Sequence, residues 1–135
     1  MTSKLREFLL PRVAERDEKL RAGQPFYAQV NFRETHKGPA FLEARRQKEL
    51  IDPAKVPLPP YYPDHPVVRD EVANYLDAIN LLDRKVGVLL AELERDKLLE
   101  NTLLFFFGDN GRCLLRGKQW VYNAGTHVPL IARWP

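Results

Sequence analysis

The stretch Phe105-Phe106-Phe107-Gly108-Asp109-Asn110-Gly111 decides the fold. The apolar run over residues 103–107 predicts a strand buried on both faces, as in a parallel sheet. The strand ends in an acid–amide pair and a glycine turn, and Lys118 follows within reach of the same point. Carboxylate and amide oxygens suit Ca²⁺ or Mg²⁺, and a lysine ammonium suits a sulfate or phosphate oxygen. The stretch therefore predicts a site for a divalent cation and an anionic substrate.

The elements around this strand predict an α/β fold. Apolar residues recur three or four positions apart over residues 67–97, which indicates a long amphipathic helix. Residues 26–32 are rich in aromatic and β-branched side chains and indicate a strand. Strand, helix and strand form a βαβ crossover, and residues 128–134 indicate a further short strand. We expect a mostly parallel sheet with flanking helices.

The remaining segments are a helix and a long connection. Residues 3–22 have apolar positions at near-helical spacing and predict an amphipathic helix interrupted at Pro11. Six prolines lie within residues 40–66, which excludes a continuous helix or central strand there. We expect a proline-rich surface loop that packs through its tyrosines, and one domain over residues 1–135.

The composition of the chain limits which classes of binding partner are expected. The chain has 135 residues and a net charge of +3, which is compatible with an anionic substrate but too small to indicate nucleic acid. The lone Cys113 excludes an internal disulfide. No apolar run approaches the about 20 residues of a membrane span, and the first residues lack the apolar core of a secretory signal. We expect neither nucleic acid nor membrane as partner; oligomeric state and compartment stay open.

Two predicted strands deliver polar side chains to one edge of the sheet. If strands 26–32 and 103–107 are parallel neighbours, the loops at their carboxyl ends face the same crevice. His36 would then lie near Asp109 and Asn110, where it could donate to an anion or act as a general acid. The plainer alternatives stay open: an Asp-Asn-Gly turn without a metal, a solvated His36, and a Cys113 that packs instead of reacting.

Three segments resemble the second signature region of the type I sulfatases, and more narrowly the branch that includes heparan N-sulfatase. They are residues 107–111, residues 116–122 and residues 125–135. The strand and histidine loop over residues 25–36, the proline segment and the long helix also fit that family. The resemblance covers nearly the whole chain from about residue 24.

The resemblance implies an alkaline-phosphatase-like α/β fold and hydrolysis of sulfate esters or sulfamates on sulfated sugars. By that likeness Asp109 and Asn110 are calcium ligands, with Mg²⁺ less favoured. Lys118 holds the sulfate, and His36 lies near the leaving group. Such an arrangement would place a cation and a lysine where negative charge collects in the transition state.

The sequence also departs from the family pattern. Family members use a formylglycine made within Cys/Ser-x-Pro-x-Arg, and no such motif occurs in these residues. We therefore expect the central portion of a sulfatase, without the nucleophile and half of the metal ligands, and inactive by itself. Gly108 replaces the usual serine, and Asn123-Ala124-Gly125 replaces an acid followed by two glycines, which predicts backbone strain at Ala124.

Two alternative functions fit the same residues. One is a phosphodiesterase or phosphonate hydrolase of the same superfamily, which also uses divalent metal and strand-end acids. The other is a non-catalytic remnant that binds a sulfated polyanion through Arg112, Arg116 and Lys118.

Overall fold

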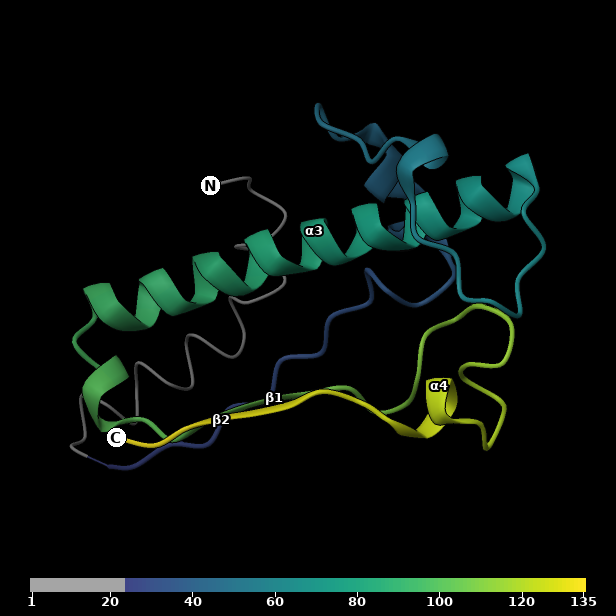
Figure 1. Ribbon diagram of the computed structural model, residues 1–135. Coiled ribbons are helices and arrows are strands. Elements are labelled where there is room, and N and C mark those ends of the chain that lie inside the picture. The colour runs from purple at the N-terminus through teal and green to yellow at the C-terminus, as the bar shows by residue number, and fades with distance from the viewer. Residues whose placement is uncertain (1–23) are drawn as a thin grey trace. The chain divides into compact units, whose positions relative to one another are not determined.

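The computed structural model describes residues 24–135, which belong to two units, one ending at Asn31 and the other beginning at Phe32. The second unit contains all the described helices and strands (Figure 1). They are α2 (Pro39–Glu43), η1 (Ala44–Arg46), η2 (Pro53–Lys55), α3 (Pro66–Arg95), η3 (Leu99–Asn101), β1 (Leu104–Phe107), α4 (Asn123–Thr126) and β2 (Leu130–Arg133). The helix predicted over residues 3–22 lies outside the described residues.

Helix α3 confirms the long helix predicted over residues 67–97. It begins with Pro66 in the first turn, where the missing N–H costs nothing. His65 caps it, since its Nδ1 accepts a hydrogen bond of 3.2 Å from the Val67 N–H. At the other end Lys97 has a positive φ of 58°, and the Leu98 N–H donates to the Leu93 carbonyl over 2.9 Å. This left-handed turn satisfies a terminal carbonyl and ends the helix.

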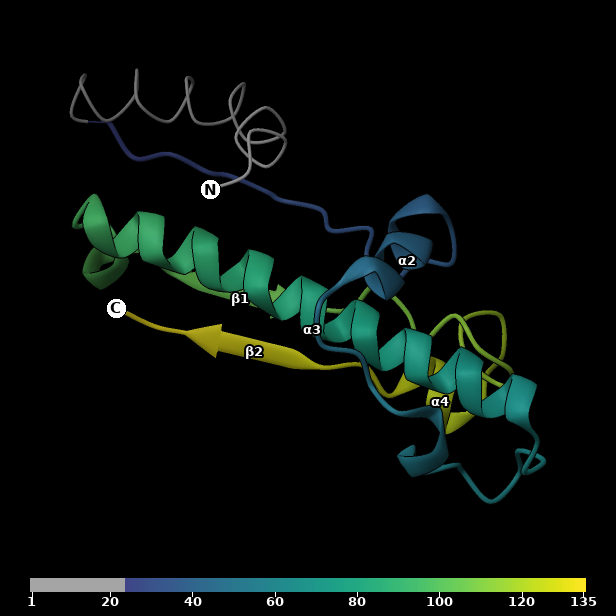
Figure 2. The ribbon, with the colours of Figure 1, turned by 90° about the horizontal axis from the view of Figure 1, so that it is seen from above.

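The proline-rich connection is ordered because it packs on the first half of α3. One cluster of buried residues is Val56, Tyr62, Val72 and Ala73. A second cluster joins Phe41 and Ala44 to Ala78. Figure 2 shows α2 beside α3. The predicted packing of the loop tyrosines is thus confirmed for Tyr62, which also donates from its hydroxyl to the Leu115 carbonyl over 2.7 Å.

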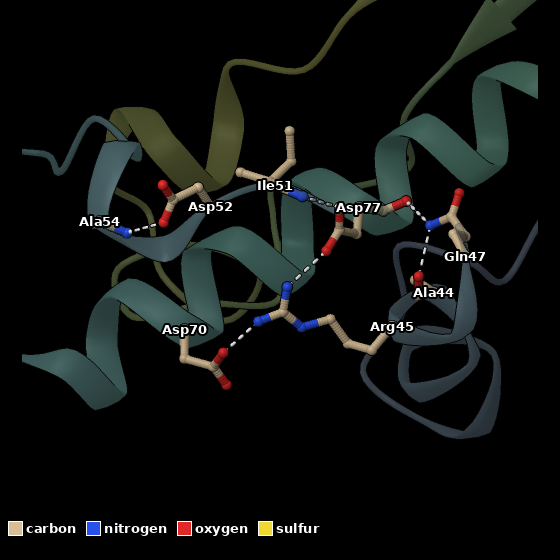
Figure 3. A network of polar contacts seen from close by, with 8 residues as sticks. All are labelled: Ala44, Arg45, Gln47, Ile51, Asp52, Ala54, Asp70 and Asp77. Atoms are coloured by element: carbon tan, nitrogen blue, oxygen red, sulfur yellow. Dashed lines mark hydrogen bonds and ion pairs between the residues drawn. The ribbon is translucent and has the colours of Figure 1, made fainter. Parts of the chain in front are cut away.

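A polar network ties the same connection to α3 (Figure 3). Asp77 is fully buried and accepts hydrogen bonds from Arg45 at 2.8 Å and from the Ile51 N–H at 2.9 Å. The other end of the Arg45 guanidinium pairs with Asp70. Burial opposes the Arg45 charge, but the hydrogen bonds to Asp77 and Asp70 outweigh it and raise the pKa of Arg45. A buried carboxylate is stable only with such partners.

The sheet differs from the predicted one. Strand β1 pairs with β2 in antiparallel register, with Phe105 opposite Ala132 and Phe106 opposite Ile131. This antiparallel pair therefore does not confirm the mostly parallel sheet that was predicted. A parallel pair needs a long crossover, usually a helix. The connection over residues 108–129 holds only the four-residue α4, and it returns the chain beside β1 (Figures 1 and 2).

Two further strand predictions are corrected. Residues 24–31 contain no regular secondary structure, so the strand expected over residues 26–32 is absent. A strand needs a hydrogen-bonded neighbour, and within residues 24–135 β1 and β2 pair only with each other. Strand β1 was expected to be buried on both faces, yet Phe105 and Phe107 are 58% and 61% exposed. The described residues provide no second layer for this face.

Among residues 24–135, no helix has both the length and the apolar character of a membrane span.

Candidate functional site

The loop after β1 folds back on the segment around α4. The Gly108 N–H donates to the Pro129 carbonyl at 3.2 Å, and the Gly111 N–H donates to the Gly125 carbonyl at 2.9 Å. A Cβ on Gly111 would lie 1.9 Å from the Ala124 carbonyl oxygen. The close approach of the two loops therefore requires glycine at position 111.

Asp109 and Asn110 lie in this loop directly after the strand, as predicted. Asp109 is exposed, whereas Asn110 is partly buried and lines a cleft. Both donors are hard oxygens, which fits calcium chemistry. Within residues 24–135, however, no three His, Cys, Asp or Glu side chains gather closely enough to hold a metal ion. The donor types therefore fit a calcium ion, but two donors are far fewer than the about six that calcium takes.

His36 lies on an exposed turn whose neighbours are anchored to α3. Glu34 is only 4% exposed and pairs with Lys85. Lys37 pairs with Glu71 at 2.7 Å. The His36 N–H closes the turn by donating to the Arg33 carbonyl at 3.1 Å. The turn is thus held on both sides of His36 by ion pairs to one helix.

Cys113 joins the histidine turn to the loop after β1. It packs against the cluster of Phe41, Ala44 and Ala78, and its thiol interacts with the backbone of Lys37. Burial is the largest influence and raises the pKa of the Cys113 thiol, although the Lys37 backbone opposes it. A partly buried thiol with a raised pKa holds little thiolate at neutral pH and is a poor nucleophile. The two loops therefore meet at Cys113, whose packing favours the interpretation of a structural cysteine.

The position of Lys118 is fixed by a backbone hydrogen bond and not by a contact of its side chain. Its N–H donates to the Arg112 carbonyl over 2.8 Å. The side chain is exposed and does not line the cleft. Of the four predicted site residues, only Asn110 lines the cleft, whereas Asp109, Lys118 and His36 lie outside it.

The cleft itself has a volume of about 570 Å³ and an aromatic and basic lining. It lies between the proline segment, α3 and the loop that joins β1 to β2. Its lining consists of Pro59, Tyr61, Tyr75, Asn110, Gly111, Arg112, Arg116, Tyr122, Asn123, Ala124, His127, Val128 and Pro129. Burial raises the pKa of Tyr75, so its phenol stays neutral across the physiological range.

Two arginines dominate the charge of the cleft. The Arg116 guanidinium carbon lies 4.1 Å from the ring centre of Tyr122 and 4.7 Å from that of Tyr61. Arg112 donates to the Tyr61 hydroxyl and lies 5.6 Å from the ring centre of Tyr62. From the sequence these arginines could be taken for surface charge. The sequence predicted them as anion-binding residues only in the polyanion-binding alternative, and only the structure pairs them with Tyr61 and Tyr62.

The backbone strain predicted at Ala124 occurs elsewhere. Ala124 lies within α4, and the positive φ in this region belongs to Arg116, at 62°. This left-handed conformation costs a non-glycine residue about 1 kcal/mol. The loop therefore places its strain on a residue of the cleft, next to Gly117.

Comparison with known proteins identifies the family. The sulfatase family model matches residues 2–135. The ulvan-active sulfatase of Formosa agariphila is 36% identical over 115 residues, which cover 85% of this chain and 19% of that protein. The human N-sulphoglucosamine sulphohydrolase is 33% identical over 87 residues, covering 64% of this chain and 17% of that enzyme.

A third relative comes from another substrate group. The N-acetylgalactosamine-6-sulfatase of Canis lupus familiaris is 32% identical over 90 residues, covering 56% of this chain and 17% of the relative. The chain thus spans about a fifth of the length of these curated relatives. Because the family model matches almost every residue, the chain belongs to the sulfatase family.

Proposed function

We propose that this chain forms part of a sulfatase that hydrolyses sulfate esters or sulfamates on sulfated sugars. The observation that carries the proposal is the sulfatase match over residues 2–135. The matched residues include the pair Asp109-Asn110 directly after β1. Their loop is held to the α4 segment by the hydrogen bond from the Gly111 N–H to the Gly125 carbonyl. The alkaline-phosphatase-like domain of that family, with its mostly parallel sheet, would be completed by residues other than those described. The exposed face of β1 is consistent with such a further layer.

The proposed roles follow from the chemistry of each side chain. Asp109 and Asn110 would hold a calcium ion, and the ion would supply positive charge against the sulfate oxygens. Lys118 would neutralise charge that collects on the sulfate or on the leaving atom. His36 would give a proton to that atom as the bond to sulfur breaks.

We infer that residues other than these 135 supply the nucleophile. The family's formylglycine motif is missing, and Cys113-Leu114-Leu115-Arg116 lacks the required proline. The Cys113 thiol is also packed against Phe41 and Ala78. Nothing at this cysteine fits a formylglycine, so the attack on sulfur is not assigned to any residue of this chain.

An assay of sulfate release tests the proposed function directly. We expect no turnover of sulfated or N-sulfated sugars by the 135-residue chain. The protein expressed from the full reading frame that contains these residues should release sulfate, and Lys118→Ala should slow release by about 100-fold or more. A full protein that releases phosphate from phosphodiesters but no sulfate would overturn the proposal. Turnover by the 135-residue chain would refute the missing nucleophile.

A further inference from the structure

Arg112 and Arg116 carry positive charge into the cleft without any acidic partner among the described residues. Their neighbours are the rings of Tyr61, Tyr62 and Tyr122 and the Tyr61 hydroxyl. Other arginines of the described chain, such as Arg45, Arg69 and Arg133, instead pair with carboxylates. The cleft arginines therefore keep unneutralised positive charge beside a hollow of about 570 Å³.

The aromatic rings hold these guanidinium groups in place and leave donors unused. Arg116 lies against two rings, and such stacking leaves the N–H edge of a guanidinium able to donate. The Nε of Arg112 is a buried donor without a hydrogen-bond partner. An unsatisfied buried donor costs about 1–3 kcal/mol. Together with the left-handed backbone of Arg116, this indicates residues arranged for a ligand and not for stability.

We propose that this cleft is a specificity subsite for a second anionic group of the substrate, with Arg112 and Arg116 as the residues that bind it. The second group is a carboxylate or a sulfate on the same glycan, distinct from the sulfate that is hydrolysed. The inference rests on the proposed sulfatase function, because that function makes the ligand a sulfated glycan. Arginine suits this role since its planar fork donates two parallel hydrogen bonds to an oxyanion.

The second anion occupies a position separate from the proposed reaction site. Lys118, which would hold the reacting sulfate, does not line the cleft. Asn110 does line it and is the neighbour of Asp109 in sequence. The subsite therefore adjoins the proposed metal-binding pair through Asn110, and one glycan could bear both anions. His127 and Asn123 add polar side chains to the same lining and suit sugar hydroxyls.

Binding without turnover tests the subsite. Calorimetric titrations of the 135-residue chain, without divalent cations, would use three probes. They are N-acetylglucosamine 6-sulfate, the same sugar linked to glucuronic acid, and a disaccharide with two sulfates and no carboxylate. We expect both two-anion probes to bind about 10-fold or more tightly than the single-anion probe. Comparison of the two indicates whether a carboxylate or a second sulfate is preferred.

Charge-matched variants distinguish binding at the subsite from nonspecific electrostatic attraction between the basic chain and an anionic probe. Arg112→Gln and Arg116→Gln should each remove most of the preference for the two-anion probes. Arg84→Gln removes the same charge from an exposed position of α3 outside the cleft and should leave the preference unchanged. If a glutamine variant loses the circular dichroism of α3, Arg112→Lys and Arg116→Lys replace it. These keep the charge but lose the fork, and should also reduce the preference.

The outcomes are separable from those of the proposed function. Equal binding of all three probes, or a preference that survives both arginine substitutions, would overturn the subsite even if the full protein releases sulfate. An arginine-dependent preference in a chain whose full protein releases no sulfate would uphold the subsite and refute the proposed sulfatase activity.

Discussion

Asp77 and Arg45 form the central ion pair of the polar network between η1 and α3, with 2.8 Å between Oδ2 and Nη1. The carboxylate of Asp77 has no exposed surface, and it also accepts from the Ile51 N–H. The pair fixes the start of the proline segment that brings Tyr61 to the cleft. Helix α3 thereby positions one wall of the proposed subsite.

Asp77→Ala should lower the free energy of unfolding by about 3 kcal/mol, because it removes the buried partner of the Ile51 N–H and one of the two carboxylates that pair with Arg45. Asp70→Ala is the matched control. Its carboxylate pairs with the same Arg45 but is 63% exposed, so the loss should stay below about 1 kcal/mol. Urea unfolding followed at 222 nm measures both, and equal losses would contradict the central role of Asp77.

Glu34→Ala should loosen the turn that bears His36, since it removes the anchor between the turn and Lys85. We expect a loss of about 2 kcal/mol in local stability and faster amide hydrogen exchange over residues 33–38. Lys37→Ala breaks the exposed pair with Glu71 in the same turn and should change exchange little. Unchanged exchange in the Glu34 variant would show that other contacts hold the turn.

Gly111→Ala should destabilise the chain by about 1–3 kcal/mol, because the new Cβ would meet the Ala124 carbonyl oxygen at 1.9 Å. Gly108→Ser restores the residue usual in the family and should be tolerated, since the nearest atoms lie 3.5 Å from the new Cβ. Thermal unfolding of the two variants compares them. A destabilised Gly108→Ser with an unaffected Gly111→Ala would contradict the loop packing.

Cys113 should react slowly with iodoacetamide in the folded chain at pH 8. Burial raises its pKa, so the thiolate fraction at that pH is small, and packing limits access. The rate should rise several-fold in urea and should also rise with pH in the folded state. Labelling that is as fast in the folded as in the unfolded chain would show an accessible thiol.

Asp64 should titrate below its ordinary pKa of 3.8, because hydrogen bonds from Arg69 stabilise the carboxylate. A lowered folded pKa means that the Asp64 contribution to stability is present above 3.8 and is lost as the pH falls below it. In Arg69→Ala, the carboxyl ¹³C titration should move up toward 3.8. Lys55→Ala removes a positive charge that pairs with Asp52 instead, and the Asp64 titration should not move.

The local pattern of the sequence determined the long helix, the polar loop after residues 103–107 and the family. The spacing of apolar residues over 67–97 is a property of one helix face, so it predicted α3 to within two residues at either end. The order of Asp109, Asn110 and Lys118 along the chain likewise needs no tertiary information. The roles of these residues stay predictions.

Only the tertiary structure decided how these pieces meet. A strand sequence does not state its partner, so the antiparallel pairing of β1 with β2 and the exposure of Phe105 depend on which segments come together. The cleft arginines depend in the same way on contacts across about 50 positions, such as that from Arg112 to Tyr61. Long-range contacts of this kind depend on which segments pack together in the fold, and no periodicity of the chain encodes them.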